Sequence, residues 1–151
     1  MQSILSTDYY VHFQENAYQS LHTYLEENFH SKIFILVDRN TKKYCLPLLL
    51  EKAKLSLAIE IIEIEAGEVF KNIETCNYLW NILSEKGADR KSLMINLGGG
   101  VITDMGGFVA STFKRGLKFI NIPTTLLSMV DASLGGKTGV DLGTLKNQIG
   151  L

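Results

Sequence analysis

The sequence of 151 residues has few of the features that mark secreted, membrane-spanning or nucleic-acid-binding proteins. Its two cysteines, Cys45 and Cys76, are isolated on expected helices, so buried free thiols are favoured over a disulfide. No apolar run approaches the roughly 18 residues that span a bilayer, and residues 1–8 lack the apolar core of a signal peptide. The formal net charge of -1 offers no basic footprint for nucleic acid or an anionic membrane. We therefore expect a cytoplasmic protein with no nucleic-acid or membrane partner.

The sequence also lacks a recognisable metal site. His12, His22 and His30 show no metal-ligand spacing, and neither cysteine stands in a catalytic context. We therefore assign no metal ligand, catalytic triad or nucleophilic cysteine to this chain. With 46% apolar and 21% charged residues, the composition is that of one globular domain with a single core.

What is present is a regular alternation of short apolar runs and helical periodicity. We expect strands at 9–13, 32–37, 58–64, 92–97 and 118–122. We expect helices at 16–29, 41–57, 72–86, 101–113 and 124–132, with Pro47 bending the second or delaying its start. This order predicts an α/β, Rossmann-like doubly wound domain over residues 1–151, with a mostly parallel sheet and flanking helices.

Three clusters of polar or glycine residues follow the ends of expected strands. Asp38 follows the strand expected at 32–37, and the glycine run 98–100 follows the strand expected at 92–97. The threonine pair 124–125 follows the strand expected at 118–122. Because ligands of parallel α/β sheets bind beyond the carboxyl ends of the strands, we expect these clusters to converge on one crevice. A phosphate can approach glycine backbone closely, and a helix N-terminus offers free N–H donors. The pattern therefore favours a phosphate-bearing ligand.

Two familiar nucleotide motifs are incomplete in this sequence. The G-x-G-x-x-G fingerprint would need glycine where Thr103 stands. A Walker A loop ending at residues 136–138 would need glycine where Asp131 stands. Structural roles also remain open: a tight turn for residues 98–100, a helix-dipole partner for Asp104, a solvated turn for Lys137 and a helix cap for Thr124 and Thr125.

Taken together, the motifs closely resemble the 3-dehydroquinate synthase family over the whole chain, most densely from Gly98 onward. Two positions depart from the commonest form, because Thr103 stands where glycine is frequent and Gly106 where threonine often occurs. The resemblance rests on L-G-G-G-V at 97–101, R-G at 115–116, P-T-T-L-L-S at 123–128, V-D at 130–131, G-G-K-T at 135–138, K-N at 146–147, G-E-V-F-K at 67–71 and D-x-N at 38–40.

The resemblance implies a lyase of the shikimate pathway, which serves aromatic amino acid biosynthesis. Such enzymes convert 3-deoxy-D-arabino-heptulosonate 7-phosphate to 3-dehydroquinate and phosphate, and they reduce and reoxidise NAD within one turnover. A divalent metal, zinc or cobalt, acts as a Lewis acid. The family's metal ligands belong to a helical C-terminal domain that lies beyond Leu151. The resemblance thus implies the N-terminal NAD-binding part of a homodimeric enzyme, inactive as an isolated chain.

Two alternatives stay open alongside this interpretation. One is a related sugar-phosphate cyclase such as 2-deoxy-scyllo-inosose synthase, and the other is a stand-alone NAD-binding module. An iron-type alcohol dehydrogenase is a more distant resemblance, because the G-K-T run at 136–138 followed by K-N at 146–147 is not typical of it.

The resemblance also assigns site residues. Asp38 is expected on the adenosine ribose, Gly99 and Gly100 on the pyrophosphate, and Asp104 towards the nicotinamide ribose. Arg115 is expected to bind substrate phosphate, from its own subunit or from the partner of a homodimer. The cofactor-binding set is Asp38, Asn40, Gly67, Glu68, Lys71, Gly99, Gly100, Val101, Ile102, Thr103, Asp104, Thr124, Thr125, Leu127, Lys137 and Lys146. The catalytic or substrate-facing set is Arg115, Asp131, Lys137, Lys146 and Asn147.

Overall fold

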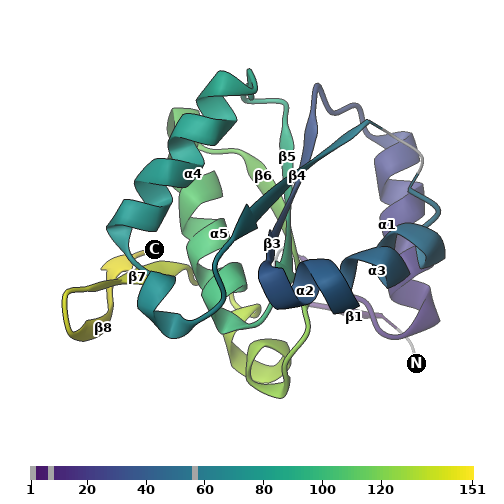
Figure 1. Cartoon of the computed structure of the whole chain (residues 1–151). Helices are drawn as coiled ribbons and strands as arrows, with labels where there is room; N and C mark the ends of the chain where they lie inside the picture. The colour runs from purple at the N-terminus through teal and green to yellow at the C-terminus, as the bar shows by residue number, and fades with distance from the viewer. Residues whose placement is uncertain (1–2, 7–8, 56–57) are drawn as a thin grey trace.

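The computed structural model describes residues 3–6, 9–55 and 58–151. A central sheet of parallel strands in the order β4-β3-β5-β6 runs through the molecule (Figure 1). Its strands are β3 (Ile33–Asp38), β4 (Ile59–Ile64), β5 (Leu93–Gly98) and β6 (Lys118–Pro123). The alternating α/β pattern of the sequence therefore produces the expected parallel sheet.

Helices cover both faces of this sheet, which confirms the doubly wound architecture. They are α1 (Glu15–Glu27), α2 (Arg39–Tyr44), α3 (Leu46–Lys52), α4 (Ile73–Glu85) and α5 (Gly100–Thr112). On one face Leu21 of α1 and Leu49 of α3 share a core with Ile35 of β3. On the other, Leu79 of α4 shares a core with Phe34 of β3. Because β3 is buried on both faces, its sequence is a continuous apolar run rather than an alternating one.

The order of the strands reverses beside β3. Ile35 of β3 lies opposite Ile61 of β4 on one side and Ile95 of β5 on the other. The backbone N–H of Thr124 donates to the carbonyl of Gly98 at 2.9 Å, which holds the end of β6 beside the end of β5. Such a reversal leaves a gap between the helices at the carboxyl ends of the strands, where ligands of this architecture bind.

The helix that the sequence predicted over residues 41–57 is two helices in the structure. α2 and α3 meet at Cys45, and Pro47 lies in the first turn of α3, where its missing N–H leaves no helical hydrogen bond unmade. α2 starts earlier than predicted because the Asp38 carboxylate accepts the backbone N–H groups of Asn40 and Thr41, at 2.8 Å each. Residues 56–57, at the predicted end of this helix, lie outside the described residues.

The two ends of the chain differ more from the sequence-based expectation. The strand expected at 9–13 is the two-residue β2 (Tyr10–Val11), which pairs only with β1 (Ile4–Leu5) in a separate antiparallel ribbon. The helix expected at 124–132 contains a π-helical turn, η3 (Ser128–Ala132). β7 (Gly139–Leu142) and β8 (Leu145–Gly150) form an antiparallel hairpin that the sequence did not predict.

The remaining elements are short. Two turns of 3₁₀ helix, η1 (Glu68–Phe70) and η2 (Phe113–Arg115), follow β4 and α5. The β7–β8 hairpin, yellow in Figure 1, contacts α5 and α4 through β7. Within the described ranges, no helix is long and apolar enough to cross a membrane.

Candidate functional site

A crevice with a cavity volume of about 390 Å³ lies where the strand order reverses. Its walls come from the ends of β3, β5 and β6 and from the loop after β4, so the three clusters that the sequence predicted to converge do so. The lining residues are Asp38, Asn40, Thr41, Tyr44, Cys45, Gly67, Gly99, Gly100, Val101, Thr124 and Thr125.

Glycine backbone forms the floor of this crevice, and little space is left for a side chain at Gly98 or Gly99. A Cβ atom at Gly98 would lie 2.5 Å from the side chain of Ile102, and one at Gly99 would lie 3.1 Å from Cγ2 of Thr125. The backbone N–H of Thr103 donates to the carbonyl of Gly99 at 3.0 Å and closes the first turn of α5. The N–H groups before it have no carbonyl one turn earlier, so they give the crevice anion-binding donors and a partial positive charge.

Asp38 supplies a carboxylate to the opposite wall. Its Oδ1 atom is the one that caps α2, and no hydrogen bond from the described residues reaches Oδ2. One oxygen is therefore fixed by the backbone while the other is free to accept a ligand hydroxyl. A carboxylate at this strand end suits a ribose hydroxyl, and glycine backbone at the neighbouring strand end suits a pyrophosphate. The crevice thus offers groups suited to a ribose and to phosphate.

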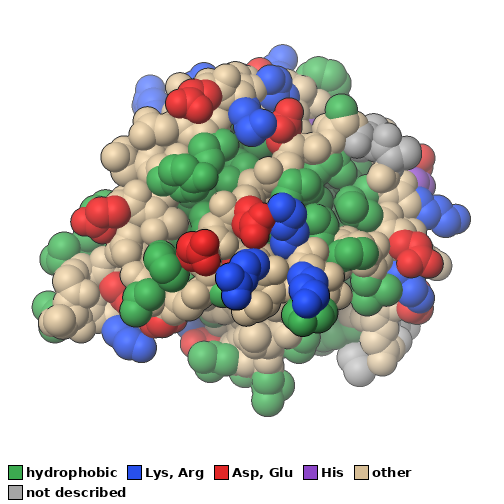
Figure 2. Space-filling view, in the orientation of Figure 1, with side chains coloured by type: hydrophobic (Ala, Val, Ile, Leu, Met, Phe, Trp, Pro, Cys, Tyr) green, Lys and Arg blue, Asp and Glu red, His purple; other side chains and the backbone are tan. Residues whose placement is uncertain are grey.

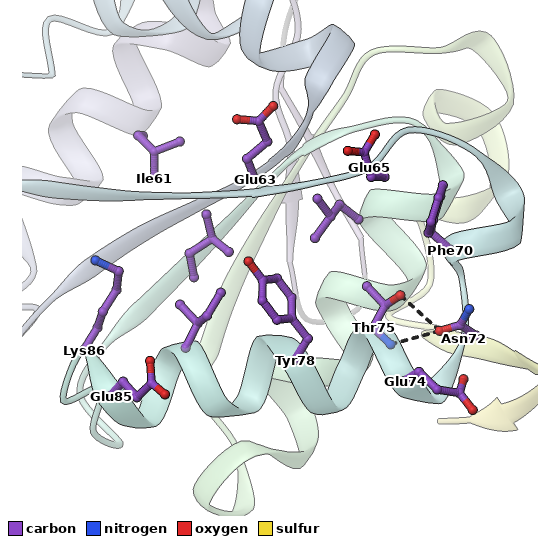
Figure 3. A pocket seen from close by; sticks show the side chains of 13 residues that line it. Ile61, Glu63, Glu65, Phe70, Asn72, Glu74, Thr75, Tyr78, Glu85 and Lys86 are labelled. Carbon is purple, nitrogen blue, oxygen red and sulfur yellow. Dashed lines mark hydrogen bonds between the residues drawn. The ribbon is translucent and has the colours of Figure 1, made fainter.

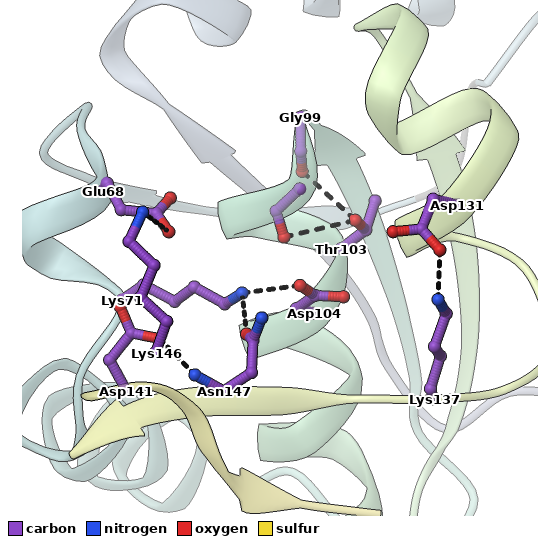
Figure 4. Close-up of polar contacts among 11 residues, drawn as sticks. Glu68, Lys71, Gly99, Thr103, Asp104, Asp131, Lys137, Asp141, Lys146 and Asn147 are labelled. Carbon is purple, nitrogen blue, oxygen red and sulfur yellow. Dashed lines mark hydrogen bonds and ion pairs between the residues drawn. The ribbon is translucent and has the colours of Figure 1, made fainter.

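A second group of predicted residues forms a hydrogen-bonded cluster beside the crevice (Figure 4). The Lys71 ammonium lies 2.6 Å from Oδ2 of Asp104 and 2.6 Å from Oδ1 of Asn147. Only 4% of the Lys71 side chain is exposed, against 17% for Asp104. Burial raises the pKa of Asp104 above its ordinary value, although the hydrogen bond and charge of Lys71 act in the opposite direction. The cluster therefore holds the Asp104 carboxylate where burial disfavours its ionised form.

The substrate-facing residues expected around the glycine loop also pair with one another. Lys137 donates to the Asp131 carboxylate, and both side chains are more than half exposed. This hydrogen bond raises the pKa of Lys137, so its ammonium stays protonated at neutral pH. The charges of both residues also act on the pKa of Asp104, with smaller effects than burial and Lys71. Lys146 lies 3.4 Å from the Glu68 carboxylate at the surface.

Other predicted site residues lie outside the crevice. The side chains of Ile102 and Thr103 are buried, so only their backbone is available to a ligand. Leu127 is 67% exposed. Hydrophobic side chains protrude at the lower edge of the face that Figure 2 shows. Arg115 is exposed after the far end of α5, about 20 Å from the glycine turn by the rise of thirteen helical residues. The structure thus brings most of the predicted residues together, but not Arg115.

Arg115 also has an unusual backbone. Lys114 and Arg115 have φ angles of 46° and 71°, in the left-handed region that side chains disfavour, and Gly116 follows with a φ of 119°. Strain of this kind persists only where surrounding structure enforces it, and it recurs at functional positions.

Sequence reasoning missed several residues of the site. Thr41, Tyr44 and Cys45 line the crevice because α2 starts directly after Asp38. The capping pattern of Asp38 with Thr41 was the available signal. Asp141 was also missed, although its Oδ1 accepts the backbone N–H of Asn147 at 2.8 Å. Its role depends on the hairpin, which the sequence did not predict.

A larger groove, with a cavity volume of about 800 Å³, lies between the edge strand β4 and α4 (Figure 3). Its charged lining is mostly carboxylate, and Asn72 already caps α4 through the backbone N–H of Thr75 at 2.9 Å. No glycine turn lines it. Among the described residues, no group of three or more histidine, cysteine, aspartate or glutamate side chains could hold a metal ion. The groove therefore lacks the glycine turn and the N-terminus of α5 that line the smaller crevice.

The fold and the crevice define a Rossmann-like α/β domain with a glycine-floored ligand site at the reversal of its strand order. The sequence model described as the N-terminal part of 3-dehydroquinate synthase matches residues 61–151. The chain belongs to the 3-dehydroquinate synthase family.

Curated relatives agree with this assignment. The 3-dehydroquinate synthase of Parabacteroides distasonis is 48% identical over 130 residues, which cover 86% of this chain and 36% of that protein. The 3-dehydroquinate synthase of Campylobacter jejuni subsp. jejuni is 48% identical over 141 residues, which cover 93% of this chain and 40% of that protein. The chain thus spans about two fifths of the length of these relatives.

Solved structures of related cyclases share the fold. A 2-deoxy-scyllo-inosose synthase matches with a TM-score of 0.85 at 25% identity, covering 99% of this chain and 43% of that chain. The 2-epi-5-epi-valiolone synthase of Streptomyces hygroscopicus, solved with NAD⁺ and Zn²⁺ bound, matches with a TM-score of 0.69 at 29% identity, covering 84% of this chain and 36% of that chain. The confirmed Rossmann-like fold is therefore shared with sugar-phosphate cyclases.

Proposed function

We propose that this chain forms the NAD-binding half of the active site of a 3-dehydroquinate synthase. The whole enzyme would convert 3-deoxy-D-arabino-heptulosonate 7-phosphate to 3-dehydroquinate and phosphate. The observation that supports this best is the crevice that joins Asp38, the glycine turn and the threonine pair 124–125 at one end of the sheet. The 48% identity to 3-dehydroquinate synthases favours this substrate over that of the structurally similar inosose synthase, which is 25% identical.

Different residues in and beside the crevice would bind different parts of the cofactor. Asp38 would accept hydroxyls of the adenosine ribose through Oδ2, because Oδ1 already caps α2. The N–H groups at the start of α5 would hold the pyrophosphate above Gly99 and Gly100. Asp104 would accept a hydroxyl of the second ribose, because Oδ2 accepts from Lys71 and no described hydrogen bond reaches Oδ1. Bound NAD would supply a reversible hydride acceptor.

The substrate would lie over the glycine loop and the hairpin. The Lys137 ammonium, kept protonated by Asp131, is a point charge suited to the phosphate or carboxylate of the substrate. Lys146 and Asn147 present a second ammonium and an amide from β8. These groups would orient an anionic sugar acid beside the cofactor, which is the positional part of catalysis.

Arg115 would act on the active site of a second copy. It lies after the far end of α5, so it would reach substrate phosphate only across a dimer interface. Its test is complementation: mixing Arg115→Ala chains with chains inactivated at Lys137 should restore part of the activity of the whole enzyme. Absence of any restoration in mixed dimers would contradict the assignment.

The metal of the family finds no ligand set among the described residues of this chain.

Calorimetric titration of the chain with NAD⁺ tests the cofactor half of the proposal. We expect one site, which ADP-ribose also occupies, because the crevice contacts the adenosine and pyrophosphate parts. No heat of binding with either ligand would contradict it. For the whole enzyme, the test is phosphate release from the heptulosonate substrate, with a hexose 6-phosphate as the competing sugar phosphate, because a 2-deoxy-scyllo-inosose synthase has been solved with carbaglucose 6-phosphate bound. Turnover of the hexose 6-phosphate alone would favour the related cyclase, and NAD⁺ binding without any turnover would favour a stand-alone binding module.

A further inference from the structure

Lys71 is placed differently from a residue that binds a ligand directly. Its side chain is buried, and two of the three N–H groups of its ammonium reach protein acceptors, Asp104 and Asn147. These acceptors belong to separate elements, helix α5 and strand β8. The Lys71 ammonium therefore joins the cofactor wall to the hairpin, as Figure 4 shows.

The backbone of Lys71 contacts the same hairpin. Its carbonyl accepts the backbone N–H of Asp141 at 2.9 Å, and Oδ1 of Asp141 accepts the backbone N–H of Asn147 at 2.8 Å. Asn147 has a φ of 52°, which holds its amide in a conformation that β-strand residues rarely adopt. Three contacts thus fix the position of one exposed amide on β8.

A buried ammonium makes these contacts obligatory. Removing an ammonium from water costs several kcal/mol unless charge and hydrogen bonds compensate it. One carboxylate and one amide provide that compensation here. While the ammonium stays buried, neither Asp104 nor Asn147 can move away without leaving it under-compensated. The positions of the carboxylate and the amide are therefore linked.

We propose that Lys71 is a positioning residue that couples occupancy of the cofactor crevice to the order of the β7–β8 hairpin. This step rests on the proposed function, because it requires a cofactor hydroxyl to donate to Oδ1 of Asp104. Such a hydrogen bond offsets part of the burial cost of the carboxylate and so favours the ionised form that pairs with Lys71. The hairpin then holds Asn147 and Lys146 more firmly when the cofactor is bound than when the crevice is empty. Lys71 thereby favours binding of cofactor before substrate.

Amide hydrogen exchange of the hairpin tests the proposal, first without ligand. Lys71→Met should accelerate exchange in residues 139–150 by about tenfold or more, since a hydrogen bond to a charged group is lost. Asn147→Gly removes the amide yet tolerates the φ of 52°, so it should have the same effect on a folded chain. Lys86→Met is the matched control, because Lys86 pairs with Glu60 at the same 2.6 Å but at the surface. It should leave exchange in the hairpin unchanged.

The second arm adds NAD⁺ at saturation. Exchange in residues 139–150 should slow further in the unmodified chain and in Lys86→Met, but not in Lys71→Met or Asn147→Gly when NAD⁺ saturates each variant. A purely structural lysine would not produce this ligand-dependent difference. Equal protection by NAD⁺ in Asn147→Gly, or unchanged ligand-free exchange in that variant, would overturn the proposal. If the unmodified chain fails to bind NAD⁺, the proposed cofactor function and the coupling fail, while the ligand-free arm still decides whether Lys71 positions the hairpin.

Discussion

The two hollows of this domain are built from different parts. The larger, about 800 Å³, is a groove between a sheet edge and the side of α4, and its charged lining is mostly carboxylate. The smaller, about 390 Å³, collects the ends of β3, β5 and β6, with backbone N–H groups at the start of α5. Size alone would select the groove. The position of donors relative to the sheet selects the crevice, because strand ends and helix N-termini converge there.

Gly98→Ala should have the largest effect, and only on the crevice. The new methyl would lie 2.5 Å from the buried side chain of Ile102 and displace the first turn of α5. We expect the free energy of unfolding to fall by about 1–3 kcal/mol. The Kd for NAD⁺ should rise by about tenfold or more, since that turn supplies the N–H donors. Denaturant titration and calorimetry measure the two effects.

Tyr78→Ala is the control for this variant in the groove, because Tyr78 lines it and is 53% exposed. It should leave the Kd for NAD⁺ unchanged. A weaker affinity for NAD⁺ in Tyr78→Ala than in Gly98→Ala would show that NAD⁺ binds in the groove and not in the crevice.

Alkaline pH should destabilise the core beneath α4. Burial raises the pKa of Cys76 from 9.0 to about 12, with a smaller effect of Glu74. The folded-state pKa is therefore the higher one, so stability from this thiol is full below pH 9 and falls as pH rises towards 12. The loss should be on the order of 2 kcal/mol by pH 11. The measurement is urea unfolding from pH 8 to pH 11.

Cys76→Ala should reduce the fall in the free energy of unfolding between pH 8 and pH 11. Cys45→Ala should reduce it less, because Cys45 lines the crevice and is only partly buried. Identical slopes in the unmodified chain and in Cys76→Ala would show that the thiol does not titrate as described.

Asp38 variants separate the cap from the ligand contact. Asp38→Ala should lower the free energy of unfolding by about 1 kcal/mol, because α2 loses its N-terminal cap. Asp38→Asn keeps a good cap but loses the carboxylate charge, so it should weaken NAD⁺ binding with little change in stability. Glu63→Gln makes the same type of change in the groove and should alter neither affinity nor the binding heat. Unchanged affinity in both Asp38 variants would remove Asp38 from the cofactor site.

Lys86→Met should have the smallest effect. The ion pair between Lys86 and Glu60 lies at the surface beside the groove, and both side chains are more than a third exposed. Exposed pairs contribute about 0–1 kcal/mol, so thermal unfolding should change little. A loss of thermal stability in Lys86→Met as large as the loss in Lys71→Met would show that burial does not distinguish the two lysines.

Much of the fold was predictable because β3 and β5 are short, mostly apolar runs, and β4 and β6 are short segments rich in isoleucine, each next to helical segments. The convergence of Asp38 with the glycine turn followed from topology alone. The β7–β8 hairpin was not predictable, since its residues are mostly exposed and carry no alternating pattern. For the same reason the Lys71 contact with Asn147, between residues 76 positions apart, required the structure. The left-handed backbone at Arg115 likewise had no signal in residue type.

The most direct measurement is ¹⁵N chemical-shift mapping of the chain during titration with NAD⁺. If the crevice is the cofactor site, backbone amides of Gly99, Gly100 and Thr125 should shift with one saturable Kd. Amides of Tyr78 and Glu85, in the larger groove, should not move. Shifts confined to the groove, or no saturable shift at the glycine turn, would contradict the assignment of the crevice to NAD.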